Sequence, residues 1–136
     1  MSLTLNKVHD LERDLIEYLN SGGWNLRHTG DSYLSYDAIG YTKKGFKCVI
    51  EMKFREKYYD TKMIEVYKYD KLLSLNEDVL KFYYVSDPKG YYLFLLNNLN
   101  DLERSDIPCP KNTLWGGTKQ IKSIYLLKER DAIVKS

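Results

Sequence analysis

The sequence has little of the residue types that characterise secreted, membrane or disordered proteins. Its 136 residues include only two cysteines and three prolines. No apolar run approaches the roughly 20 residues that a membrane-spanning helix needs, and residues 1–7 contain no apolar signal-peptide core. We therefore expect a cytoplasmic protein that does not enter a membrane.

The two cysteines, Cys48 and Cys109, lie far apart, and neither has a companion cysteine or a closely spaced histidine. This spacing argues against a disulfide framework and against a zinc cage. Cys48 lies in an apolar run, so we expect it to be a small core residue.

The chain also has no large excess of charge of one sign, because 21 basic and 19 acidic side chains leave a net charge of +2. This balance neither requires nor excludes a nucleic-acid partner. Apolar residues make up 43% of the chain, enough for a globular core, and the length predicts a single domain over residues 1–136. Tyrosine is abundant, with 13 residues. Most of them are explained by packing in half-buried strands, although tyrosine also stacks on bases.

Apolar periodicity and turn residues predict an α/β domain with a central mixed sheet. A first helix is expected over residues 6–20, ending at two glycines. A hairpin is expected further along, with strands at 36–41 and 46–54 and a turn at 42–45. The remaining expectations are a short strand at 24–28, a loop at 55–61, a helix at 65–75, strands at 80–85 and 91–96, an irregular segment at 97–117, a strand at 119–126 and a short helix in the tail.

Three charged residues fall on the hairpin in places that need an explanation. Side chains alternate along a strand, so Glu51 and Lys53 share one face of the apolar strand 46–54. Buried charges are normally paired or bind a metal. Asp37 opens the preceding strand, and a hairpin that turns near Gly45 brings it beside Glu51. Asp31 is an alternative to Asp37, although its place after a glycine suits a turn.

Glu12 adds a fourth charge, because it falls inside the apolar stripe of the first helix. A carboxylate in such a stripe needs a partner on the sheet against which the helix packs. One interpretation places Glu12 with Asp37, Glu51 and Lys53 in a single site. The other pairs it with an arginine such as Arg27.

A site of this composition suits a hard divalent cation. Carboxylates match Mg²⁺ or Mn²⁺, which retain waters and also bind substrate phosphates. Such a metal lowers the pKa of a bound water and stabilises charge during in-line attack on a phosphate. A neighbouring lysine orients the water and neutralises developing negative charge.

Asp37 followed by Glu51-Met52-Lys53 resembles the D…(D/E)-x-K signature of the PD-(D/E)XK nuclease superfamily. The helix around residues 11–16 looks like the first helix of the Holliday-junction-resolvase branch, which also contributes a glutamate. Small nucleases of phages and mobile elements in this superfamily are a similar match. The order of elements resembles a restriction-endonuclease-like core of helix, three-stranded meander, helix and further strands. The resemblance covers residues 7–96 and leaves residues 97–136 as a C-terminal extension.

The resemblance implies a Mg²⁺- or Mn²⁺-dependent endonuclease that hydrolyses DNA, including junctions or other branched DNA. Asp37, Glu51 and the backbone carbonyl of Met52 would bind the metal. Lys53 would serve the attacking water, and Glu12 would support a second metal or the ligands of the first. The resolvases dimerise, so the resemblance also implies that this chain forms a homodimer.

Further residues are candidates for contact with DNA. Ser32 and Ser35 lie in a loop that resembles the serine-bearing loop of the resolvases, and Lys68 flanks the apolar stripe of the second helix. For Lys68 a solvated side chain is the competing interpretation. Lys62 and Lys71 are expected on a solvated face, from which lysines can also reach phosphates.

Two other functions stay open. One is a nucleic-acid-binding module on the same fold without catalysis. The other is a protein-interaction factor encoded by a phage or mobile element, to which the residues after the predicted core would be suited. Two carboxylates facing phosphate favour the nuclease, because without a cation their charge would weaken DNA binding.

Overall fold

The structure is a computed structural model that describes residues 4–110 and 119–136. The side chain of Cys109 lies outside the described part of the chain. The order of elements is α1 Leu5–Ser21, β1 Asn25–His28, β2 Ala38–Tyr41, β3 Lys47–Phe54, β4 Thr61–Glu65, α2 Val66–Leu73, β5 Leu80–Asp87, β6 Gly90–Leu95, β7 Glu103–Pro110, β8 Lys119–Lys128 and β9 Val134–Lys135, with short 3-10 helices at Leu96–Asn98 and Glu129–Asp131.

The central sheet has six strands in the order β1-β2-β3-β5-β6-β9. Strands β1, β2 and β3 form an antiparallel meander, and β3 pairs in parallel with β5. The connection from β3 to β5 runs through β4 and α2, as a parallel pair requires a crossover. The predicted α/β fold with a central mixed sheet is therefore confirmed.

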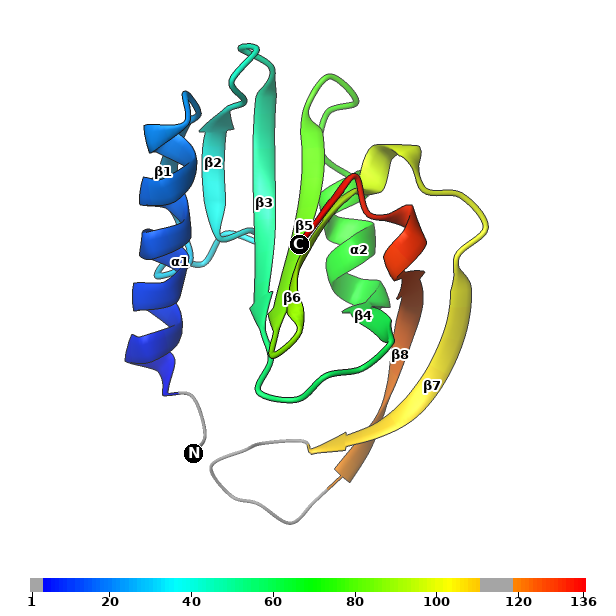
Figure 1. The fold of residues 1–136 in the computed structure, drawn as a ribbon. Helices are drawn as coiled ribbons and strands as arrows, with labels where there is room; N and C mark the ends of the chain where they lie inside the picture. Colours follow the sequence, from blue (N-terminus) through cyan, green and yellow to red (C-terminus); the bar gives the residue numbers. More distant parts are fainter. Residues whose placement is uncertain (1–3, 111–118) are drawn as a thin grey trace.

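A separate core covers each face of this sheet. On one face, α1 packs through Ile16 against Leu26, Ile50 and Phe82. On the other face, α2 and a second sheet enclose Val49, Tyr83 and Phe94. Figure 1 shows α1 to the left of the central sheet and α2 with β4, β7 and β8 to its right. Residues 48–52 of β3 are all buried, because the strand is covered on both faces, and this explains the apolar run at residues 48–50.

The ends of α1 follow from its sequence. The Thr4 side chain accepts a hydrogen bond from the backbone N–H of Lys7 (3.2 Å), which caps the first turn. Gly23, with φ of 107°, lets the chain turn away after Gly22. The helix therefore ends where the two glycines predict.

The structure corrects three predictions, the first two through its second sheet. This sheet has the order β4-β8-β7, so β4 begins at the end of the expected loop 55–61, and β7 occupies part of the segment expected to be irregular. Two prolines in β7 made this segment look irregular in the sequence. Prolines are nevertheless tolerated in β7, because it is an edge strand. The tail contains a 3-10 helix and the short strand β9 instead of a longer helix.

Lys62 is buried, not solvated as expected, with only 2% of its surface exposed. Its Nζ lies 2.8 Å from Oδ2 of Asp87 and 3.3 Å from Oε2 of Glu129. Tyr58 donates a hydrogen bond of 2.6 Å to the same Glu129 oxygen. Lys62 belongs to β4 and Asp87 to β5, so this ion cluster ties the second sheet to the central one.

Within residues 4–110 and 119–136, no helix is long and apolar enough to span a membrane.

Candidate active site

Asp37 lies directly before β2, at the point where the meander meets the middle of β3. Its backbone N–H donates to the carbonyl of Ile50 (2.9 Å), and its Oδ2 accepts from the N–H of Met52 (2.8 Å). Since Ala38 pairs with Ile50, one further step along the antiparallel ladder places Asp37 across from Glu51. The backbone thus fixes the Asp37 carboxylate beside that of Glu51.

The loop between β1 and β2 is also held by hydrogen bonds to Asp37. The backbone N–H groups of Thr29 and Gly30 both donate to the carbonyl of Asp37, at 2.8 and 3.1 Å. The Thr29 hydroxyl donates to the carbonyl of Tyr36 (2.8 Å). These bonds hold Asp37 from the side of β1, in addition to its hydrogen bonds with β3.

Glu51 is a buried carboxyl, with 6% of its surface exposed. Burial, reinforced by hydrogen bonding and charge repulsion from Asp37, raises the pKa of Glu51 well above its usual range. The ammonium of Lys68 opposes this shift from 4.0 Å away. The pair of carboxyls thus favours either a shared proton or a bound cation.

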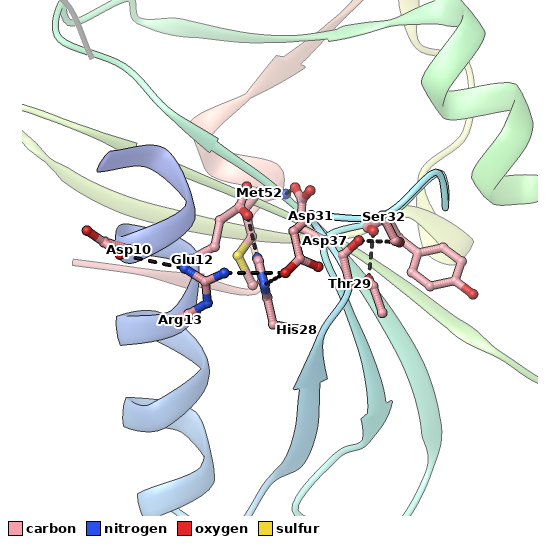
Figure 2. Close-up of polar contacts among 10 residues, drawn as sticks. Asp10, Glu12, Arg13, His28, Thr29, Asp31, Ser32, Asp37 and Met52 are labelled. Atoms are coloured by element: carbon pink, nitrogen blue, oxygen red, sulfur yellow. Dashed lines mark hydrogen bonds and ion pairs between the residues drawn. The ribbon is translucent and has the colours of Figure 1, made fainter. Parts of the chain in front are cut away.

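Glu12 approaches the same aspartate from α1, on the other face of the sheet. It is buried, and its Oε1 lies 2.7 Å from Nε2 of His28 (Figure 2). Burial raises the pKa of Glu12, the charge of Asp37 adds to this, and the His28 hydrogen bond works against it. Glu12 therefore interacts with Asp37 through charge, whereas the hydrogen-bond partner of Glu12 is His28.

Gly30 lies where these groups converge. A Cβ added to it would overlap Oε1 of Glu12 and lie 2.9 Å from Nε2 of His28 and 3.0 Å from Oδ1 of Asp37. A methyl group at this position would therefore force the Glu12 carboxyl to move.

The pairing of Glu12 with Arg27 proposed above is wrong, and sequence reasoning missed His28 as the partner. In β1, Leu26 is buried towards α1, Arg27 is exposed, and His28 returns to the face of Leu26. Alternation along this strand was a signal that could have identified His28. Asp31, the alternative to Asp37, is exposed, and its Oδ2 lies 3.3 Å from Nη2 of Arg13 and 3.8 Å from Nδ1 of His28.

Lys53 lies two residues beyond Glu51, on the same face of β3, and is exposed. Partial burial of its amine, followed by the positive charges of Arg55 and Lys68, lowers the pKa of Lys53. Glu65 and Glu51 attract it and oppose the shift. Lys53 is therefore a lysine next to the carboxyl pair that releases its proton more easily than an isolated lysine.

A cavity of about 270 Å³ opens over the carboxyl pair. It brings together Asp37, Glu51, Ser35 and Lys68 from the predicted set. Its lining does not include the other predicted residues, Glu12, Ser32, Met52 and Lys53. The full lining is Tyr33, Leu34, Ser35, Asp37, Glu51, Tyr67, Lys68 and Lys71. The predicted convergence of four charged side chains on one cavity is thus met only by Asp37 and Glu51.

Ser32 has a local structural role in the loop. Its hydroxyl donates to the carbonyl of Thr29 (2.6 Å) and accepts from the N–H of Leu34 (3.3 Å). These bonds shape the loop that carries Tyr33 and Ser35 to the cavity.

The described residues contain no group of three or more histidine, cysteine, aspartate or glutamate side chains arranged to hold a metal ion. The donor set at the cavity is the carboxylates of Asp37 and Glu51. Mg²⁺ is commonly bound through one or two carboxylates and completes its shell with waters and substrate phosphates. The residues present therefore fit Mg²⁺ or Mn²⁺ and do not suit a soft metal that needs sulfur or several imidazoles.

Together, the mixed sheet, the α1 layer and the crossover through α2 define a restriction-endonuclease-like fold. Among solved structures, the chain is similar to the Holliday junction resolvase Hjc from the archaeal hyperthermophile Archaeoglobus fulgidus. The TM-score is 0.60 at 14% sequence identity, covering 92% of this chain and 86% of that chain. At this identity the likeness shows the fold. No family model and no curated protein matches the sequence.

Proposed function

We propose that this chain is a metal-dependent nuclease that hydrolyses phosphodiester bonds in DNA. The observation that carries the proposal is the pair of adjacent carboxyls, Asp37 and Glu51, placed under a cavity lined by lysines. A fold shared with a DNA junction resolvase supports DNA as the substrate.

In this proposal, Asp37, Glu51 and the backbone carbonyl of Met52 hold Mg²⁺ or Mn²⁺. A bound divalent cation supplies a low-pKa water and stabilises negative charge on the phosphate. The backbone fixes Asp37 through the N–H of Met52, so this ligand is oriented before the metal arrives.

The lysines have separate roles. Lys53, with its lowered pKa, orients the attacking water or takes up its proton. Lys68, at the wall of the cavity, binds a phosphate of the substrate. Glu12 is a positioning residue, since it lies outside the cavity and acts on Asp37 through charge.

A second candidate is a nucleic-acid-binding module without catalysis, which the exposed tyrosines and lysines at the cavity favour. The carboxyl pair favours the nuclease over the binding module, because buried like charges weaken phosphate binding unless a cation lies between them and the phosphate.

The test is cleavage of single-stranded, duplex and branched DNA with Mg²⁺ or Mn²⁺. We expect Glu51→Gln and Asp37→Asn to lower the rate by at least about 100-fold, as loss of metal-supported stabilisation predicts. Glu17→Gln, on the exposed face of α1, is the matched control and should cut normally. Wild-type protein that binds DNA but cuts none of these substrates would leave the binding module as the function.

Lys53→Ala provides a second criterion. If Lys53 serves the water, this substitution lowers the cleavage rate far more than the DNA affinity. Equal losses of rate and affinity would show that Lys53 only anchors a phosphate.

A further inference from the structure

Two exposed tyrosines line the cavity over the carboxyl pair. Tyr33 is fully exposed on the loop between β1 and β2, and Tyr67, in the first turn of α2, is 64% exposed. Asp37 and Glu51 line the same cavity as both rings. A phosphate held at the carboxyl pair would therefore have an aromatic ring within reach of its neighbouring nucleotides.

Other tyrosines of the chain are explained by packing. Tyr83 is buried and donates a hydrogen bond to the carbonyl of Met63 (2.6 Å). The rings of Tyr69 and Tyr125 pack edge to face, with centroids 4.8 Å apart. A fully exposed ring such as that of Tyr33 gains no such stability and leaves its apolar faces in water.

Lysines accompany these rings. Lys68 and Lys71 line the same cavity, and Nζ of Lys71 lies 4.7 Å from the centroid of the Tyr67 ring. Rings that stack on bases, interleaved with ammonium groups that track phosphates, are the usual means of binding a single strand. The lysine over Tyr67 also brings a positive charge close to any base stacked near it.

A second cavity continues the path beyond Tyr67. Its volume is about 500 Å³, and Tyr67 lines it together with Glu65, Val66, Lys122 and Ser123. Tyr67 thus stands between two cavities, one with the carboxyl pair and one with Lys122. A strand that leaves the first cavity over Tyr67 would meet the Lys122 ammonium in the second, where Nζ of Lys122 also lies 3.1 Å from Oε1 of Glu65.

We infer that the site takes single-stranded DNA, and that Tyr33 and Tyr67 stack on bases next to the scissile phosphate. In a continuous duplex the base faces are covered by their neighbours, so only unpaired nucleotides can offer a face to these rings. The inference rests on the proposed function for the position of the phosphate, and it adds the substrate class.

In the binding test every protein also carries Glu51→Gln, which removes the buried charge that opposes phosphate binding, and EDTA prevents cleavage. Fluorescence anisotropy compares a labelled single-stranded oligonucleotide with a blunt duplex of equal length. We expect this parent protein to prefer the single strand, and the added Tyr33→Leu and Tyr67→Leu substitutions each to weaken single-strand binding by about tenfold. Tyr33→Phe and Tyr67→Phe keep a stacking face and should bind almost normally.

The matched control is Tyr41→Leu, which changes another exposed tyrosine, located at the opposite end of β2 and lining a different cavity. Equal affinity for duplex and single strand, no measurable binding to either, or leucine variants that behave like Tyr41→Leu would each overturn the inference.

Failure of this inference is distinguishable from failure of the nuclease proposal. Loss of single-strand affinity in the leucine variants, without cleavage by the wild type, would support stacking and reject catalysis. Metal-dependent cleavage that is equally fast on duplex and single strand, and unchanged in the leucine variants, would support catalysis and reject stacking.

Discussion

Replacement of Glu51 by glutamine should stabilise the metal-free protein at alkaline pH. Glu51 is buried beside Asp37, and the resulting cost of its negative charge raises its pKa. Glutamine has nearly the same shape but no charge, so Glu51→Gln removes this cost while filling the same space.

The sign of the effect follows from proton linkage. A raised pKa means that the folded state binds the Glu51 proton more tightly than the unfolded state, so stability falls as the pH rises above the unfolded value of about 4.3. A tenfold difference in proton affinity between the two states corresponds to about 1.4 kcal/mol. We expect Glu51→Gln to gain about 2 kcal/mol at pH 8, a conservative value for a buried carboxyl, or about 6 °C in melting temperature for a chain of this size.

The assay is thermal unfolding followed by circular dichroism, in EDTA at pH 5 and pH 8. The gain of the variant should shrink at pH 5, because this pH is close to the unfolded-state pKa and folding of the wild type then takes up only a small part of a proton. Mg²⁺ should raise the melting temperature of the wild type and leave that of Glu51→Gln almost unchanged, because ligand binding stabilises only a folded state that can bind it. The exposed Glu17→Gln serves as the control and should melt like the wild type.

Two results would refute this reasoning. A Glu51→Gln protein that is less stable than the wild type at pH 8 would mean that the Glu51 carboxylate is favourably paired in the folded state. A gain of equal size at pH 5 and pH 8 would mean that the effect is one of packing and not of charge.

Three further predictions concern the surroundings of the site. Gly30→Ala should lower the free energy of unfolding by about 1–3 kcal/mol, since the new methyl group displaces Glu12, and it should also reduce cleavage. Urea unfolding measures the stability, and a curve identical to that of the wild type would contradict this prediction. His28→Ala removes the hydrogen-bond partner of Glu12 and should cost about 1–2 kcal/mol in the same assay, whereas His28→Gln should cost less. Lys62→Met leaves Asp87 buried without its ion pair and should lower the free energy of unfolding by about 3 kcal/mol. The cleavage rate per folded molecule should stay the same, and a change in that rate would link the ion cluster to catalysis.

The central sheet was predictable because its signals are local. Strand β3 contains the apolar run of residues 48–50, and the turn before it contains Gly45 with φ of 87°. The register of that hairpin follows from the turn, and it places Asp37 across from Glu51. These carboxyls were thus brought together by pattern alone.

The second sheet was not predictable in this way. Its strand β4 pairs with β8, whose residues lie about sixty positions further along the chain, as the pair Glu65 and Ile124 shows. No local turn signals such a pairing, so Lys62 looked like one of several solvated lysines. Its burial depends on Asp87 and Glu129, which come from two other parts of the chain.

The division of the site between two layers explains why Glu12 and Glu51 do not share a cavity. Glu12 comes from α1, on one face of the sheet, and Glu51 faces α2 on the other. Asp37 acts on both carboxyls, because its charge raises the pKa of Glu12 and the pKa of Glu51. Oδ2 of Asp37 is held by the Met52 N–H, and Oδ1 lies near Gly30 beside Glu12. A change in the charge of Glu12 therefore changes the potential at the Asp37 carboxylate, which lines the cavity and accepts the Met52 N–H, so α1 contributes to the electrostatics of the site from outside the cavity.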